Sequence, residues 1–324
     1  MKQPGYKLVL LVFTILIFRS GYSQDIESGT PYNAPVLSNP AMTGSHPDGL
    51  MILSYRDFYS GNNYQIGSVF VSYDSYFEQV HGGFGAYLTE NRLGKILNDL
   101  RSGVTYSYHL RATRELYINA GFMASVIHRS INRNEIIFPD QIDPLLGPVL
   151  ASSEILDQGS RTVFDAGIGF LVRFRDYHAG ISVNHLATPD MSRNGNREGR
   201  LGRRYSLHTS ARYRLAQSPF YLNPLFYSSY QDGFLSYVGG ISLEYKILAI
   251  NNLIHCYSTG GINAIQTGLH LDLNRFGFSY NYLFSPLRPS GMIPGTLSNQ
   301  ITVYIRLNNV DKTTVINTIN YPKL

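Results

Sequence analysis

The sequence predicts an all-β protein, a transmembrane antiparallel outer-membrane β-barrel of about 14 strands. Three observations lead to this prediction. The chain begins with a secretory leader, and no later apolar run is long enough for a membrane helix. Apolar and polar residues then alternate along many stretches of the chain. The longest connections between these stretches all fall on one side of the predicted barrel.

Residues 1–23 have the parts of a signal peptide. Lys2 and Lys7 precede an apolar run over 8–18, and the small residue Ser23 stands before the predicted cut. The run covers roughly half of the about 20 residues that a membrane-spanning helix requires, so cleavage is favoured over a retained anchor. The mature protein is therefore expected to be exported.

Charge and cysteine content exclude several classes of protein. The chain has 27 Lys+Arg against 22 Asp+Glu, a net charge of +5. Removal of the leader takes Lys2, Lys7 and Arg19 with it and leaves 24 against 22, a charge of +2. A nucleic-acid partner requires a basic face or stripe, which this balance does not provide. The single cysteine, Cys256, excludes an internal disulfide framework and a Cys-rich zinc site.

A period of two is the main structural signal. Between 203 and 215, apolar residues such as Tyr205 and Leu207 alternate with polar residues such as Arg204 and His208. A soluble β-sandwich also alternates. However, these strands reach about ten residues where soluble strands average about five or six. Their polar face is rich in Gly, Ser, His, Arg and Asp, which suits a barrel lumen better than a solvated surface.

The order of the strands gives a topology. The predicted strands are 50–58, 64–76, 81–90, 99–110, 114–128, 162–173, 176–185, 203–215, 220–230, 235–246, 249–257, 263–273, 275–284 and 299–308. An even number places both termini in the periplasm, so connections after odd-numbered strands are the outer loops. The long gaps at 129–161, 186–202 and 285–298 follow the fifth, seventh and thirteenth strands. The sequence therefore predicts that loop 129–161 is outside the cell.

We expect four consecutive segments. They are a signal peptide at 1–23, a polar periplasmic lead-in at 24–49, one transmembrane barrel at 50–308 and a C-terminal tail at 309–324.

The alternation also assigns faces. The polar residues predicted to face the lumen are His109, Asp165, Arg204, His208, Arg212, His270, Asp272 and Arg306, and the residues predicted to face lipid are Phe276, Phe278, Tyr280 and Val303. An arginine in the lipid-facing middle of a barrel strand costs about 2–4 kcal/mol. Leu207→Arg is therefore predicted to impair folding far more than His208→Arg.

No motif in the sequence predicts catalysis, a cofactor or a metal. The nine histidines are dispersed without metal-ligand spacing. Ser182, Asn184 and His185 are close in sequence, but strict alternation would place His185 on the opposite face from the other two. Glycine pairs such as Gly167 and Gly169 do not stand before the start of a helix, which a phosphate-binding loop requires. They are better explained as small residues within a strand that leave room on the lumen side.

The lead-in carries the start of a family resemblance. The stretch 33–44, with Asn39, Pro40, Ala41 and Gly44, resembles the opening motif of the PorP/SprF family of type IX secretion system membrane proteins. Later motifs of the family are matched by Tyr55, Arg56, Asp165, Gly167, Gly169, His185 and Pro189. The resemblance extends over nearly the whole mature chain.

The resemblance implies a non-enzymatic outer-membrane barrel of the Bacteroidetes secretion and gliding apparatus. Such proteins support secretion and cell-surface attachment of an adhesin-like client. The implied partners are outer-membrane lipid, the client, and periplasmic and outer-membrane proteins of the apparatus. The motif residues would then be structural or would contact partners. Asn39, Pro40, Ala41 and Gly44 would form an ordered periplasmic plug or turn, and His185 and Pro189 would shape the outer mouth. Deletion of 25–44 is predicted to leave an inserted barrel that no longer supports display.

Other functions stay open from the sequence. A fourteen-stranded barrel also suits an outer-membrane channel or a substrate-specific transporter. A lipid-modifying barrel enzyme would require a catalytic set assembled across strands, and a soluble secreted β protein would require the sandwich interpretation.

Overall fold

The computed structural model describes residues 32–46, 49–59, 65–132, 135–143, 146–149, 152, 160–191, 199–215, 217–257, 262–286 and 296–307. The predicted signal peptide and C-terminal tail lie outside these residues. Within the described ranges, no helix has both the length and the apolar character to cross a membrane.

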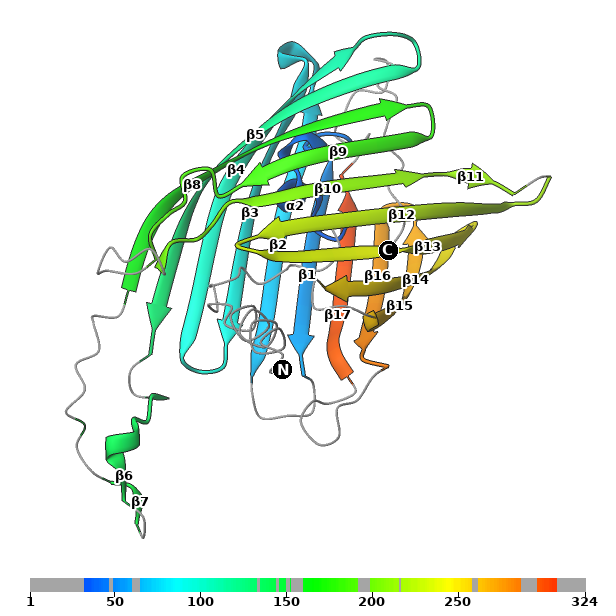
Figure 1. Cartoon of the computed structure of the whole chain (residues 1–324). Coiled ribbons are helices and arrows are strands. Elements are labelled where there is room, and N and C mark those ends of the chain that lie inside the picture. Colours follow the sequence, from blue (N-terminus) through cyan, green and yellow to red (C-terminus); the bar gives the residue numbers. More distant parts are fainter. Residues whose placement is uncertain are drawn as a thin grey trace, which may run out of the picture.

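Fourteen long antiparallel strands form one closed barrel (Figure 1). Its strands are β1 (Leu50–Phe58), β2 (Ile66–Phe77), β3 (Gly82–Leu93), β4 (Leu97–Arg111), β5 (Leu116–Ile131), β8 (Ser160–Phe174), β9 (Tyr177–Asn184), β10 (Arg204–Ala211) with its continuation β11 (Tyr213–Arg214), β12 (Phe220–Gln231), β13 (Phe234–Tyr245), β14 (Leu248–Tyr257), β15 (Ile262–Leu273), β16 (Phe276–Phe284) and β17 (Thr296–Arg306). The ring closes because β1 pairs with β17 and β10 pairs with both β9 and β12. The predicted outer-membrane β-barrel is confirmed.

Side-chain alternation accounts for the closed sheet. On β10, Arg204, Ser206 and His208 are buried, whereas Tyr205 and Leu207 are exposed by 47% and 45%. Successive side chains of a strand point to opposite faces, so the polar set lies inside and the apolar set meets lipid. A sheet with these two faces has to close, because an open edge in lipid would leave backbone groups without hydrogen bonds.

Aromatic rings collect at the strand ends that are joined by short turns. The ring centroids of Phe84 and Tyr106 lie 4.8 Å apart, and those of Tyr177 and Tyr213 lie 5.5 Å apart. Phe220 stacks on Tyr245 at 4.7 Å. Rings with an apolar body and a polar tip favour the membrane–water interface, so these pairs form part of an interfacial girdle.

The connections follow the predicted order. Short turns join β2 to β3, where the 3-10 helix η2 (Glu78–Val80) lies, and also β4 to β5, β8 to β9 and β13 to β14. The long connection between β5 and β8 contains the 3-10 helix η4 (Pro139–Gln141) and a small hairpin of β6 (Ile142–Asp143) and β7 (Gly147–Pro148). In Figure 1 this hairpin lies well beyond the strand ends.

A tag inserted beside Gly147 is expected to be labelled on intact cells. Gly147 has open space around its Cα, and neighbouring Leu146 is exposed by 73%, so an insertion disturbs no packing. The matched control is the same tag inserted at Arg114, in the turn between β4 and β5. That tag should be labelled only after the outer membrane is permeabilised. The opposite pattern would invert the topology.

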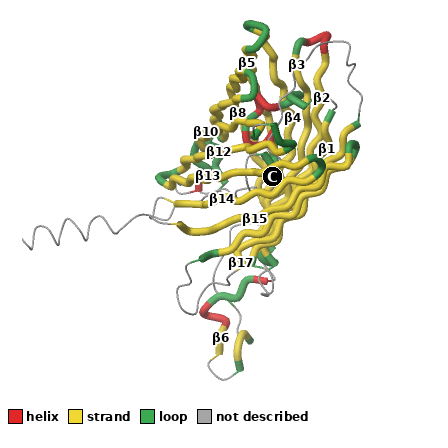
Figure 2. Tube along the Cα trace, turned by 90° about the vertical axis from the view of Figure 1, so that its right-hand side faces the viewer, coloured by secondary structure: helices red, strands yellow, loops and turns green. Residues whose placement is uncertain are grey.

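One segment of the lead-in lies inside the barrel. It runs from Tyr32 to Ser45 and contains the short helix α2 (Pro35–Ser38) and the 3-10 helix η1 (Pro40–Met42). Figure 1 shows α2 between the front and back walls, and Figure 2 shows the same helical turns from the side. We call residues 32–45 the plug.

The position of the plug makes one expectation more specific. The sequence predicts a polar periplasmic lead-in, with an ordered plug or turn at Asn39, Pro40, Ala41 and Gly44, and the structure buries Asn39 and Ala41 inside the barrel with an exposed fraction of 0%. The physical reason is that the barrel interior is itself polar, so a Pro- and Asn-rich segment can be buried there with its hydrogen bonds satisfied.

Candidate functional site: the plug and the wall that holds it

The plug takes its shape from residues that cap two short helices. The side-chain oxygen of Asn39 accepts a hydrogen bond of 2.9 Å from the backbone N–H of Ala41, which caps η1. Pro40 occupies the first helical position, where a missing N–H costs nothing. Gly44 has a φ of +68°, a conformation that glycine adopts without strain. The family motif therefore determines the local fold of the plug.

The Asn39 side chain also ties the plug to three strands. Because its oxygen is used by the cap, its nitrogen Nδ2 faces the wall as a donor. It lies 3.2 Å from the carbonyl oxygen of Phe170 on β8 and 3.3 Å from that of Ile181 on β9. It also lies 3.0 Å from Nε2 of His208 on β10. One amide thus links β8, β9 and β10.

The last turn of the plug is held by β2 and β4. The Thr43 hydroxyl donates to the hydroxyl oxygen of Thr105 at 2.9 Å, and the Thr43 carbonyl lies 2.9 Å from Nε2 of His109. The backbone N–H of Gly44 donates to the Asp74 carboxylate at 2.7 Å. These three hydrogen bonds anchor the turn to both strands.

Backbone carbonyls of the plug accept hydrogen bonds from wall side chains. The Ala41 carbonyl accepts from the Ser107 hydroxyl at 3.1 Å and from the Asn119 amide at 3.3 Å. The Ser38 carbonyl accepts from the Ser182 hydroxyl at 2.7 Å. Unpaired carbonyls at helix ends are costly when buried, and the lumen wall satisfies these.

The start of the plug reaches the other end of the chain. The Asn33 amide donates to the side-chain oxygen of Gln300 on β17 at 3.2 Å. The Tyr304 hydroxyl donates to the Asn33 side-chain oxygen at 3.3 Å. The plug therefore joins the last strand to the first strands of the barrel.

Glycines in the wall let the plug approach the sheet. A Cβ placed on Gly121 would lie nearer than 3.0 Å to the backbone of Pro40 and Ala41. Gly169 has no room for a Cβ beside the Asn39 side chain, and Gly83 has none beside the last turn of the plug. At Gly121 and Gly83 a glycine is required by close approach of the plug backbone, and at Gly169 by the side chains of Asn39 and Pro40.

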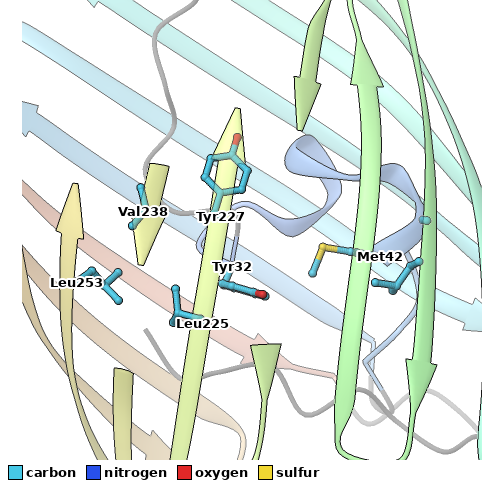
Figure 3. Packing of buried hydrophobic residues seen from close by; sticks show 8 residues of the cluster. Tyr32, Met42, Leu225, Tyr227, Val238 and Leu253 are labelled. Atoms are coloured by element: carbon cyan, nitrogen blue, oxygen red, sulfur yellow. The ribbon is translucent and has the colours of Figure 1, made fainter. Parts of the chain in front are cut away.

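Apolar side chains fill the space on both sides of the plug. One cluster joins it to strands β8 and β12–β14 (Figure 3), and consists of Tyr32, Ala41, Met42, Leu171, Leu225, Tyr227, Val238 and Leu253. A second cluster joins it to strands β1–β3 and β5, and consists of Ala34, Val36, Leu37, Leu50, Ile52, Phe70, Tyr87 and Met123. The plug thus spans the lumen from wall to wall.

Tyr32 lies at the centre of this packing. Its ring meets the rings of His178 and His208 edge-on, with centroid distances of 5.8 and 6.1 Å. Burial raises the pKa of the Tyr32 phenol well above its ordinary value. The phenol is therefore neutral at physiological pH.

A buried acid–base pair lies at the end of β8 and β9 that carries the long connections. Nδ1 of His185 is 2.6 Å from the carboxylate of Asp165, and both side chains have an exposed fraction of 0%. The predicted outward orientation of His185 is wrong, because β9 ends at Asn184 and His185 has a φ of +58°. This turn brings its ring inward, beside the family-motif aspartate.

The remaining motif residues have structural contacts. Nε of Arg56 donates to the Ser298 hydroxyl at 3.1 Å, and its guanidinium lies 4.6 Å from the ring centroid of Phe58. Tyr55 faces outward with 53% exposure. The Pro189 carbonyl accepts from the N–H of Leu201 at 2.9 Å in the outer connection. Gly167 leaves room for Asn184 on β9.

The residues predicted to face the lumen meet inward-facing partners. Arg212 pairs with Glu244 at 3.0 Å. Arg306 pairs with Asp272 at 2.6 Å. Arg204, His208 and His270 are buried. Among the described residues, no group of three or more His, Cys, Asp or Glu side chains could hold a metal ion.

His208 is more constrained than the sequence suggests. Its side chain is 1% exposed and lies against the plug, so an arginine there would have to displace Asn39. Tolerance of His208→Arg is therefore no longer expected, since overpacking of such a site is itself destabilising.

Several residues of this site escape sequence reasoning. Ser107, Asn119, Ser182 and Gly121 hold the plug but are ordinary members of a polar strand face in the sequence. The available signal is a run of small and amide residues on the inward face of β4, β5, β8 and β9. A lumen filled only by charged side chains would not require such small residues.

Several solved structures match most of the chain at low sequence identity. The outer membrane protein Omp33 of Acinetobacter baumannii is 7% identical with a TM-score of 0.48, and the match covers 82% of this chain and 100% of that one. The toluene transporter TodX of P. putida is 13% identical with a TM-score of 0.47, over 88% and 94%. A Pseudomonas aeruginosa FadL homologue is 10% identical with a TM-score of 0.46, over 89% and 97%.

A comparison with protein families, unlike the comparison with solved structures, identifies the family of the chain. No curated protein matches the chain. The family model described as type IX secretion system membrane protein PorP/SprF matches residues 20–289. This range contains the plug, the glycine-lined wall and the Asp165–His185 pair. The chain is an outer-membrane β-barrel and belongs to the PorP/SprF family of type IX secretion system membrane proteins.

Proposed function

We propose that this barrel is a non-enzymatic subunit of the type IX secretion apparatus that supports secretion and cell-surface attachment of a client protein. Family membership supports a role in type IX secretion. One observation favours contact over conduction: the plug packs against opposite walls through two apolar clusters. A barrel filled in this way offers surfaces for partners rather than a path for solutes.

The same observation weighs against the channel alternative. A solute path requires a continuous water-filled lumen, as larger barrels have. Here Met42 and Tyr32 belong to one buried apolar cluster with residues of the far wall, including Leu225 and Leu253. Opening a path would break these contacts together with the hydrogen bonds of Asn39.

The buried acid–base pair supports a structural role over catalysis. Asp165 and His185 pair with each other at 2.6 Å in a fully buried site. The nearby hydroxyl of Ser182 donates to the Ser38 carbonyl of the plug. A hydrolase would require that hydroxyl to face the histidine and a substrate.

Burial of the plug also shifts the proposed contact surface for the apparatus. Since the lead-in residues 32–45 are inside the barrel, periplasmic partners would meet the short turns at the same end. Those turns carry exposed charges, such as Arg175 and Glu115, whose side chains are 60% and 48% exposed. Charged rims of this kind set orientation and association rate more than affinity.

Deletion of residues 25–44 behind an intact leader tests the proposal. The purified full-length protein should show no steady conductance in a planar bilayer, whereas the truncated barrel should conduct. In native cells the truncation should abolish surface display of type IX clients, measured by protease shaving of intact cells. Leu146→Ser, in an exposed loop, is the matched control and should retain both properties.

Two results would contradict the proposal. Steady conductance by the full-length protein would favour the channel. If cells that carry an inserted, truncated barrel still display the client normally, the plug is not required for display.

A further inference from the structure

The outer end of β8 extends beyond its neighbour β9. On one side β8 pairs with β5 along its whole length, from Ser160 opposite Ser130 to Phe174 opposite Leu116. On the other side β9 pairs with β8 only over 168–174. The segment 160–167 therefore has a neighbouring strand on one side only.

The backbone groups on the open side can be assigned by alternation. The Ala166 carbonyl accepts from the N–H of Leu186 at 2.9 Å, so it points toward the β9 side. Along a strand, the N–H and C=O groups of every second residue point the same way. Thr162 and Phe164 therefore present their backbone groups to this open side. We call residues 160–164 the β8 edge.

The chain after β9 makes no backbone hydrogen bond to the β8 edge in the described residues, although the Asp190 side chain approaches Arg161. Beyond Leu186 it forms its own pairing, with the Leu201 N–H donating to Pro189 at 2.9 Å and the Met191 N–H donating to Gly199 at 2.8 Å. Within the described ranges, no backbone hydrogen bond reaches Thr162 or Phe164 from the β9 side.

The β8 edge lies at the outer boundary of the apolar band. Phe164 and Phe170 face outward with 58% and 50% exposure, as lipid-facing residues do. One step further out, the Thr162 hydroxyl lies 2.8 Å from Nδ1 of His128, so the outward face is polar there. Unpaired backbone groups cost several kcal/mol within lipid, so they are placed where a partner or water can reach them.

We propose that the β8 edge binds an extended segment of an exported polypeptide, which adds to the barrel as an extra strand. Among the conformations of a bound polypeptide, an extended backbone is the one that matches N–H and C=O groups repeating at every second residue. This inference deepens the proposed function and rests on it, because it assigns a docking position to the client.

The side chains around the edge define the segment. Phe164 on the outward face requires an apolar neighbour, because the adjacent lipid is apolar. On the inward face Arg161 is 34% exposed and forms a long ion pair of 4.0 Å with Asp190. Arg200, which lies opposite Asp190 in a β-bridge, is exposed, so two arginines face one carboxylate here. The matching segment therefore alternates apolar and acidic residues.

Thr162→Pro is the sharpest test of the edge. Its N–H points away from β5, so proline removes a donor from the open side and leaves the β5 pairing intact. Arg161 before it is already extended, as a residue before proline should be. Thr162→Val is the matched control, because it removes the hydroxyl but keeps the N–H.

The probe is an end-capped octapeptide of alternating valine and glutamate, added to the full chain in lipid nanodiscs. Binding should be saturable, and Thr162→Pro should weaken it about tenfold, the loss expected for one to two backbone hydrogen bonds. Thr162→Val should bind as the wild type does. A valine–lysine octapeptide should bind at least about fivefold more weakly, because like charges meet Arg161.

Amide hydrogen exchange provides a second readout. Without peptide, the amides of Thr162 and Phe164 should exchange fast and those of Arg161 and Val163 slowly, because the latter bond to β5. Bound peptide should slow the exchange of the Thr162 and Phe164 amides and leave that of Arg161 and Val163 unchanged. Slow exchange of all four amides without peptide would show that the chain covers its own edge and would overturn the inference. A dimer of the wild type that Thr162→Pro dissociates would assign the edge to a second copy and overturn it too.

The inference and the proposed function fail separately. Loss of display in native cells by a folded Thr162→Pro barrel supports both. Normal display by that variant, together with no peptide binding to the wild type, overturns the edge as a docking site. The proposed function would still stand if the deletion of residues 25–44 abolishes display.

Discussion

Gly121→Ala is expected to destabilise the folded barrel by about 1–3 kcal/mol, the range for overpacking a tight interior. The added Cβ would lie nearer than 3.0 Å to the backbone of Pro40 and Ala41, which cannot move as a flexible side chain can. The plug then has to shift, and its hydrogen bonds to Ser107 and Asn119 lengthen. The loss should show as a lower unfolding midpoint in denaturant and as faster proteolysis of the plug.

Gly239→Ala is the matched control. Gly239 also lies within a central strand, but its Cβ would meet only the ring of Phe226 at 3.8 Å, an ordinary contact. The free energy of unfolding of the Gly239→Ala protein should change little or rise slightly, because alanine loses less conformational entropy than glycine on folding. Equal effects of the two substitutions would mean that the plug does not press against this wall.

Leu207→Arg should destabilise the barrel by about 2–4 kcal/mol, because it places a charge on the lipid face of β10. Leu207 is 45% exposed and pairs across the sheet with Ile181, itself 55% exposed, in the middle of the apolar surface. Refolding into lipid vesicles, followed by the heat-dependent gel shift of folded barrels, measures the change. The gel shift distinguishes folded from unfolded protein in the same sample.

Leu207→Met keeps the apolar surface and is the control for this position. It should fold with the wild-type yield, since methionine replaces leucine with little loss in apolar surroundings. If Leu207→Arg folded as well as Leu207→Met, the assignment of faces on β10 would be wrong. His208 is unsuitable as a control, because the plug occupies its surroundings.

The barrel could be predicted from the sequence because the alternation of apolar and polar residues can be recognised within each strand alone. Alternation at Tyr205, Leu207 and His208 reports which face each residue takes without reference to distant parts of the chain. The length of the connections then gives the topology. The strand predicted at 50–58, for example, is β1 as the structure has it.

The burial of the plug across the lumen could not be predicted in the same way. Its Pro and Asn residues locally indicate a turn or a loop, and its burial depends on partners far along the chain. His185 illustrates a smaller failure, because a single positive φ at the end of β9 reverses the expected face. The resemblance singled out Asn39 and Gly44, but only the structure shows that they contact the glycine-lined wall.

The position of the plug also makes folding of the chain more cooperative. Asn39 bonds to residues 131 and 169 positions away, and Asn33 to one 267 positions away. Contacts over such separations form late, because the entropy of closing large loops must be overcome first. Once formed, they couple the first strands to the last, so that loosening any one of them weakens the whole ring. We therefore expect plug and barrel to unfold in a single transition rather than in two.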